Sequence, residues 1–233
     1  NSDLRRGKTT VNVAWSNSHG VLIGDFIYSK AFMLMNEIGN FKVIDELSSA
    51  TNKIAEGELM QLANKNNLNT SLQQLKKISY YKTGRLFEAS AKSAAMLSGK
   101  SIPFIENISK AAKLIGIAFQ VRDDLLDYGV SKGNIGKPEM QDILEDKITY
   151  PLYFALKNSS KKDSSKILKK LKNKDFSIEE VADFVSSSNA FNKCNSLIQN
   201  YSNEISKCIN QISNKEIRDE MLNLSESLKN RYE

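Results

Sequence analysis

The chain has 233 residues, of which 40% are hydrophobic and 26% are charged, so it can bury the core of one large domain or two small ones. No apolar run approaches the roughly 18 residues that a membrane span requires, and no secretory signal stands at Asn1. We therefore expect a cytoplasmic protein without a transmembrane segment, and the lone His19 excludes a metal site built from several histidines.

The net charge of +6 raises the question of nucleic-acid binding. Much of the excess is lysine within "KNSSKKDSSKILKKLKNKD" (157–175), where no aromatic residue is available to stack on bases. We therefore expect a solvated, lysine-rich connector there and no nucleic-acid partner. Cys194 and Cys208 lie on one expected helix, about 21 Å apart along its axis, too far for a disulfide. Both are interpreted as small buried side chains in a reducing compartment.

Helical spacing of valine and isoleucine runs through the whole chain, which only three prolines and 11 glycines interrupt. Because no pair of strands is convincing, the sequence predicts one all-α domain over 1–233, with no repeat and no linker. The predicted helices cover residues 14–37, 40–64, 70–97, 103–127, 139–157, 163–172, 178–187, 189–213 and 215–231.

Two of these helices carry more specific signals. Ser177 and Glu180 form a capping-box pattern at the start of helix 178–187. Helix 189–213 places apolar side chains in alternating steps of three and four, which predicts a buried stripe and no further role. The stripe consists of Phe191, Cys194, Ile198, Tyr201, Ile205, Cys208 and Ile212.

Helix 103–127 ends in three carboxylates, within "FQVRDDLLD" (119–127). Asp123 and Asp127 are four residues apart, and Asp124 and Asp127 are three apart, so all three share one helix edge. Like charges repel there, and the helix dipole disfavours anions at a C-terminal end. Because two local rules are broken, we favour a functional site over a solvated helix end. Clustered carboxylates suit Mg²⁺, and Gln120, one turn earlier, adds a neutral polar group.

Basic segments accompany the carboxylates. "LRRGKTT" (4–10) is a basic loop, and "YYKTGRLFE" (80–88) places Lys82 beside Thr83 and Gly84, which weaken a helix. "GNIGKPEMQDILEDK" (133–147) is a loop with Lys137 that leads into a helix with Asp142 and Lys147. Cations beside a carboxylate–metal site indicate a phosphate-bearing substrate. The Gly-Lys-Thr at 7–9 is no P-loop, because Ser2 stands where that motif needs glycine and no strand precedes it.

Six segments in order resemble the trans-type isoprenyl diphosphate synthases, in particular their bacterial long-chain, octaprenyl-type branch. They are "RRGKTT", "GDFIYSKAF", "EGELMQL", "YYKTGRLFE", "FQVRDDLLDY" and "GKPEMQDILEDKITYP". The likeness runs from Leu4 to about Leu156, and beyond it only the helical character agrees. It implies a single-domain helical bundle around a deep central cavity, and a homodimer.

The resemblance also implies a Mg²⁺-dependent prenyltransferase. Its substrates would be isopentenyl diphosphate and an allylic diphosphate such as farnesyl diphosphate. Its product would be a long polyprenyl diphosphate, of octaprenyl type, for quinone side chains. The family pattern assigns catalytic roles to Lys82, Asp123 and Asp124, and metal binding to Asp123, Asp124 and Asp127. It assigns substrate binding to Arg5, Arg6, Lys82, Thr83, Gln120, Lys137 and Lys147.

Two features depart from the family pattern. The first aspartate-rich motif, which in relatives ends just before the residues matching "NSDLRRG", is absent, so we expect an N-terminally incomplete domain. Met140 stands where relatives often carry glycine, which makes the conformation of that loop a point of difference. Product length is not readable. The apolar side chains of helix 14–37 (Phe26, Phe32, Met33 and Met35) either line the cavity or belong to the core, and we favour the core.

Three alternatives share much of this pattern. A terpene cyclase is disfavoured, because the Arg5–Arg6 pair, the Lys82–Thr83 pair and Gln120 all fit chain elongation. A shorter-chain synthase stays open. A non-catalytic helical partner subunit of a synthase also stays open, although such subunits usually lose the aspartates that this chain retains.

Overall fold

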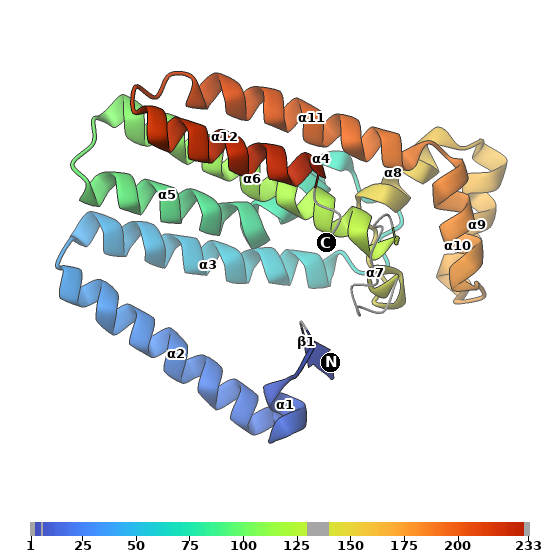
Figure 1. Ribbon diagram of the computed structural model, residues 1–233. Coiled ribbons are helices and arrows are strands. Elements are labelled where there is room, and N and C mark those ends of the chain that lie inside the picture. Colours follow the sequence, from blue (N-terminus) through green and yellow to red (C-terminus); the bar gives the residue numbers. More distant parts are fainter. Residues whose placement is uncertain (1–2, 6, 130–139, 231–233) are drawn as a thin grey trace.

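The computed structural model describes residues 3–5, 7–129 and 140–230, and these form a bundle of helices (Figure 1). The helices are α1 (Val11–Ala14), α2 (Asn17–Ile38), α3 (Phe41–Ala63), α4 (Leu72–Ser79), the π-helix η1 (Tyr80–Gly84), α5 (Arg85–Leu97), α6 (Ile102–Asp127), α7 (Gln141–Leu144), α8 (Tyr150–Asn158), α9 (Lys161–Asn173), α10 (Ile178–Ser187), α11 (Ala190–Ile209) and α12 (Lys215–Asn230). The all-α prediction is confirmed. Within the described ranges, no helix combines the length and apolarity needed to cross a membrane.

A small hairpin precedes the helices. Its strands, β1 (Leu4–Arg5) and β2 (Lys8–Thr9), pair antiparallel with Leu4 opposite Thr9. Gly7 has a φ of +72°, a conformation that a tight hairpin turn needs and that glycine adopts without strain. The prediction that the chain holds no strand pair is therefore wrong at this one place.

Helix α6 forms the centre of the bundle, where α5 and α11 pack along it (Figure 1). It buries 13 of its 26 residues. Ile115 packs against Ile205 and Ile209 of α11, and small residues such as Ala111 let neighbouring helices approach closely. The predicted stripe on helix 189–213 is confirmed, because Cys194, Ile198, Ile205, Cys208 and Ile212 are all buried.

Helix α2 lies apart from the rest of the bundle and meets α3 at one end (Figure 1). It buries none of its residues. Phe26 is 70% exposed and Met33 is 56% exposed, so the interpretation of these side chains as core is wrong within this chain. The helix is nevertheless well bounded, since Ser16 caps its first turn and Gly39, in the left-handed conformation, ends it. The predicted helix 14–37 corresponds to α2, and the short α1, which was not predicted, precedes it across Trp15 and Ser16.

Two further predicted helices are interrupted. The span 70–97 forms α4, the π-helix η1 and α5, which follow one another without a loop. The span 139–157 forms α7 and α8 with a loop between them, because Pro151 stands in the first turn of α8 and begins a new helix. Lys147 therefore lies in a loop and not in a helix. At the predicted capping box, Ser177 accepts from the Glu180 N–H, but the Glu180 carboxylate pairs with Lys170 instead.

Candidate active site

The π-helix η1 presents Lys82 and Thr83, and two glycines hold it in place. A Cβ on Gly57 of α3 would lie 2.7 Å from the backbone nitrogen of Lys82. A Cβ on Gly116 of α6 would lie 2.6 Å from the Cα of Gly84. Real Cβ atoms do not approach so closely, so only glycine at both positions lets α3 and α6 pack against η1 from two sides. A one-turn π-bulge of this kind is typical of functional sites, because it re-aims side chains within a helix.

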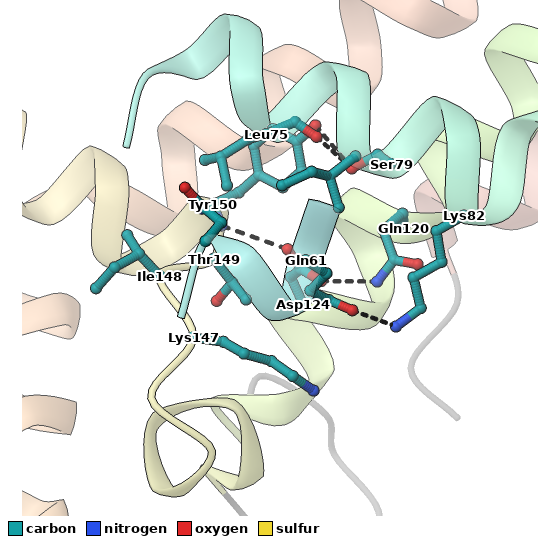
Figure 2. Close-up of a pocket in the computed structure, with 12 residues that line it drawn as sticks. Gln61, Leu75, Ser79, Lys82, Gln120, Asp124, Lys147, Ile148, Thr149 and Tyr150 are labelled. Atoms are coloured by element: carbon teal, nitrogen blue, oxygen red, sulfur yellow. Dashed lines mark hydrogen bonds between the residues drawn. The ribbon is translucent and has the colours of Figure 1, made fainter. Parts of the chain in front are cut away.

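A row of hydrogen bonds joins η1 to Asp124, and Figure 2 shows its part around Gln120, Asp124 and Tyr150. The Thr83 hydroxyl donates to Gln120 Oε1 over 2.9 Å, and Gln120 Nε2 donates to Asp124 Oδ1 over 2.9 Å. The backbone N–H of Tyr150 donates to Asp124 Oδ2 over 3.3 Å. Three residues predicted to belong to the site are thus in contact, although Thr83 lies 41 positions from Asp124 in the sequence.

The Lys82 ammonium points to the same cluster. Its Nζ donates to Gln61 Oε1 over 2.6 Å and lies 3.4 Å from Glu58 Oε1. Sequence reasoning quoted the segment around Gln61 and Glu58 but gave neither residue a role. The signal that could have found them is their spacing on α3. Glu58 directly follows Gly57, which packs against η1, and Gln61 lies three residues further on, so both share the side of α3 that faces η1.

Burial sets the protonation of Asp124, which is 5% exposed. Burial, followed by the negative charge of Asp142, raises the pKa of the Asp124 carboxyl well above its ordinary value. The hydrogen bonds from Gln120 and from the Tyr150 N–H oppose this shift, since they stabilise the charged form. The carboxyl is therefore easier to protonate than a surface aspartate.

Asp127 is engaged by the backbone at the start of α7. Its Oδ1 accepts from the Gln141 N–H over 3.1 Å, and its Oδ2 accepts from the Asp142 N–H over 2.9 Å. Its backbone carbonyl accepts from Met140 N over 2.8 Å. Both carboxylate oxygens thus hold the start of α7, and Asp127 is 3% exposed.

Asp123 differs from its two neighbours. It is half-buried, and no hydrogen bond or ion pair engages it within the described ranges. Its donor chemistry fits a hard cation such as Mg²⁺, which accepts few carboxylates and completes its shell with water and phosphate oxygens. Across the part of the chain that the structure describes, no three His, Cys, Asp or Glu side chains converge as a complete metal site. The aspartates therefore fit Mg²⁺ only as one side of its coordination shell, with Asp123 as the side chain ready to bind.

Of the four other residues predicted to bind substrate, the structure describes the side chain of Lys147 alone. Lys147 forms ion pairs with Glu145 over 2.5 Å and with Asp142 over 3.5 Å, and it lines the same cavity as Lys82 and Asp124. Burial by itself lowers the pKa of Lys147, but the hydrogen bond to Glu145 and the charge of Asp142 raise it overall. The backbone of Arg5 belongs to β1, and its side chain lies outside the description. Arg6 and Lys137 lie outside the described residues.

The cavity itself is small, about 30 Å³, enough for about one water molecule. Twelve residues line it, among them Gln61, Lys82, Gln120, Asp124 and Lys147 (Figure 2). Its polar side chains contact one another directly. The ammonium groups of Lys82 and Lys147 and the carboxyl of Asp124 line this cavity together. Such an arrangement can hold a diphosphate when the two lysines exchange their present partners for phosphate oxygens.

Known proteins share the sequence pattern. The polyprenyl synthetase family model matches residues 1–188. The octaprenyl diphosphate synthase of Escherichia coli is 40% identical over 166 residues, which cover 71% of this chain and 51% of that protein. The all-trans-nonaprenyl-diphosphate synthase of Rhodobacter capsulatus is 36% identical over 194 residues, 83% of this chain and 59% of that protein. The chain therefore spans about half the length of the curated relatives it matches.

Solved structures share the fold. A polyprenyl synthase from Caulobacter crescentus, in complex with calcium and isoprenyl diphosphate, superposes with a TM-score of 0.92 at 28% identity over 100% of this chain and 72% of that one. A decaprenyl diphosphate synthase from Rhodobacter capsulatus gives a TM-score of 0.90 at 27% identity with the same coverage. The predicted isoprenoid synthase fold is confirmed. The chain belongs to the polyprenyl synthetase family.

Proposed function

We propose that the chain is part of a prenyltransferase that elongates an allylic diphosphate with isopentenyl diphosphate. The observation that carries the proposal is the cluster of Lys82, Thr83, Gln120 and Asp124, brought together from η1 and α6 in a chain of this family. Relatives named as octaprenyl diphosphate synthases support the same activity. The polyprenyl synthase in complex with calcium and isoprenyl diphosphate supports a diphosphate substrate and a divalent metal.

Each residue has a role that follows from its chemistry. Lys82 and Lys147 bind the oxygens of the allylic diphosphate, for which their present partners, Gln61 and Glu145, are exchanged. Thr83 and Gln120 orient the cluster, and Asp123 is the outward ligand for Mg²⁺. When bound, the metal neutralises charge that gathers on the leaving diphosphate. Arg5, Arg6 and Lys137 are proposed as further diphosphate ligands, on the family pattern alone.

The reaction needs no side-chain nucleophile. The C–O bond of the allylic diphosphate breaks, and the diphosphate leaves with the electron pair. The double bond of isopentenyl diphosphate attacks the allylic cation, and a proton passes to the departed diphosphate. Fixed cations such as Lys82 stabilise the leaving oxygens in the transition state, which is the dominant kind of catalytic contribution. The preferred allylic primer is farnesyl diphosphate, and the product is a long chain of octaprenyl type for a respiratory quinone.

A homodimer is part of the proposal. Helix α2 carries large apolar side chains around its whole circumference, and eight of them are exposed. A helix that is apolar on all sides is stable in water only when other protein covers it. A second copy of the chain, packed on α2 and on the exposed Phe41 and Leu59 of α3, would cover these side chains. A cytoplasmic location is also proposed, since Cys194 and Cys208 are free thiols.

The test is condensation of farnesyl diphosphate with labelled isopentenyl diphosphate in the presence of Mg²⁺, with products separated by length. We expect a ladder that ends near one long chain. Lys82→Ala should lower kcat/KM at least about 100-fold, because it removes a fixed cation from the leaving group. Lys193→Ala, which removes an exposed lysine of α11, is the control and should leave the rate unchanged.

The alternatives predict other outcomes. A ladder that ends at a short chain would favour a shorter-chain synthase. No incorporation would be decisive only if a longer version of the protein, extended at its N-terminus, were silent too. In that case the non-catalytic partner subunit would replace the prenyltransferase as the preferred function.

A further inference from the structure

The net charge of the chain is concentrated on a single helix. Residues 161–174, which comprise α9 and its C-cap, hold seven of the 33 basic residues and one of the 27 acidic residues. The rest of the chain therefore holds 26 of each sign, so it is electrically balanced. The surplus of +6 that characterises the whole protein belongs to this one element.

The fold separates the two faces of α9. Ile167 and Leu171, four residues apart, are buried against α8 and α10. Ser164 also faces inward, since its hydroxyl donates to the Leu156 carbonyl of α8 over 2.8 Å. Lys162, Lys166 and Lys169 follow the spacing i, i+4, i+7 and lie on the opposite, exposed face.

No acidic side chain balances this outer face. Lys170, at its edge, pairs with Glu180, and Lys174 pairs with Asp146. Within the described residues, Lys162, Lys166 and Lys169 form no ion pair. Asp163, the one acid of α9, accepts a hydrogen bond from the Ser160 hydroxyl at the helix start. We name the three lysines Lys162, Lys166 and Lys169 the α9 basic face.

We propose that the α9 basic face binds an anionic membrane surface. It lies at the end of the bundle farthest from the α2–α3 turn (Figure 1), so it can approach a flat surface without contact from α2. Lysines on one helix face are attracted to acidic lipid headgroups, and their contributions add. Between α8 and α11 no large apolar side chain is exposed among the described residues, so the helix adsorbs at the headgroups without insertion.

Nucleic acid is the weaker partner for this face. No arginine occurs between Arg122 and Arg218, so the planar fork that matches phosphate and guanine is missing here. No exposed aromatic residue of α9 can stack on bases. A membrane needs only the point charges that lysine supplies. The inference does not rest on the proposed activity, because none of the three lysines lines the cavity that holds Lys82 and Asp124.

The test is sedimentation of the complete chain with vesicles, without substrate. Vesicles of phosphatidylcholine mixed with phosphatidylglycerol should bind the protein, whereas vesicles of pure phosphatidylcholine should not. The triple variant Lys162→Gln, Lys166→Gln and Lys169→Gln should bind at least about tenfold more weakly. The control variant Lys42→Gln, Lys110→Gln and Lys193→Gln removes three exposed lysines from α3, α6 and α11 and should bind like the original chain.

Salt and circular dichroism sharpen the result. Raising the salt concentration should release the protein, because screening weakens attraction between exposed charges. Equal helicity of both triple variants would show that a loss of binding is not a loss of fold. Equal weakening by the two triple variants, equal binding to both kinds of vesicle, or binding to duplex DNA but not to vesicles would each overturn the proposal.

Discussion

Helices α2 and α6 are similar in length and both are slightly more than half apolar, yet the structure uses them in opposite ways. Helix α6 buries half of its residues between α5 and α11, whereas α2 buries none. The difference lies in where small residues fall. Ala111, Ala112, Gly116 and Ala118 let neighbouring helices come close to α6, and α2 offers Gly20 and Gly24, whose surroundings are open.

The same contrast extends to charge. Helix α6 buries Asp124 and Asp127 among hydrogen-bond donors from α6 itself, α7 and α8, while Asp25 of α2 is exposed. Apolar content alone therefore does not decide whether a helix is core. Contacts within the chain stabilise α6 and its site, and we expect contacts between two copies to stabilise α2.

The largest effect should come from equivalent truncations in the two helices. Ile115→Ala should lower the free energy of unfolding by about 2–5 kcal/mol, because Ile115 is fully buried and leaves a cavity. Ile27→Ala in α2 should change it by no more than about 0.5 kcal/mol, since Ile27 is 61% exposed. Urea denaturation at low protein concentration measures both. Similar losses for the two variants would contradict the contrast.

Replacement of glycine by alanine should change the free energy of unfolding in opposite directions in α2 and α6. Gly116→Ala should destabilise by about 1–3 kcal/mol, because the new Cβ would overlap Gly84. It should also raise KM for the allylic diphosphate, because η1 carries Lys82. Gly24→Ala should stabilise by up to about 1 kcal/mol, since no atom lies within 4 Å of its new Cβ and alanine favours helix. If both substitutions were neutral, the close packing of α6 on η1 would be refuted.

Substitutions at two positions with a left-handed backbone, Gly39 and Met140, should have a smaller effect on stability. Gly39, the C-cap of α2, has a φ of +68°, and Met140, the N-cap of α7, has a φ of +61°. Gly39→Ala should cost about 1 kcal/mol, since its new Cβ meets no atom and only backbone strain is added. Met140 is buried, so both truncations cost stability, but Met140→Gly should be about 1 kcal/mol more stable than Met140→Ala. In an ordinary helix the order of glycine and alanine is reversed, which makes thermal unfolding of the pair decisive.

The pH dependence should show the smallest effect. The pKa of Asp124 is raised in the folded state, so its contribution to stability is present below the ordinary aspartate pKa and is lost as pH rises through the folded-state pKa. The original chain should therefore lose stability over this pH window relative to Asp124→Asn. Asp25→Asn, which removes an exposed carboxyl of α2, is the comparison variant. Parallel curves for Asp124→Asn would show that burial does not shift the pKa of Asp124.

Much of the fold could be predicted from sequence, because helical periodicity reports which residues share a face. Helix α6 was predicted over 103–127 and occupies 102–127. The break at η1 was signalled by Thr83 and Gly84, but its form could not be predicted, since the π-turn depends on Gly57 and Gly116 of other helices. Met140 stands where relatives often carry glycine, but its positive φ was not predicted, since the sequence left the conformation of that segment open.

The site was predictable in composition and less so in its contacts. Spacing placed Gln120 and Asp124 on one edge, where they are hydrogen-bonded. Spacing could not reveal that Asp127 holds the start of α7 or that Gln61 holds Lys82, because both partners are distant in sequence. The apolar pattern of α2 was taken for core because periodicity does not say whether a covering surface comes from the same chain or from another.

We claim that contacts within the chain stabilise α6 and that contacts with a second copy stabilise α2. Hydrogen–deuterium exchange tests this claim most directly. It is measured on the complete chain at protein concentrations well below and well above the Kd of the dimer. We predict that α6 amides are protected at both concentrations and that α2 amides become protected only at the higher one. Equal protection of α2 and α6 at the lower concentration, or an unprotected α2 in a protein that is dimeric, would contradict the claim.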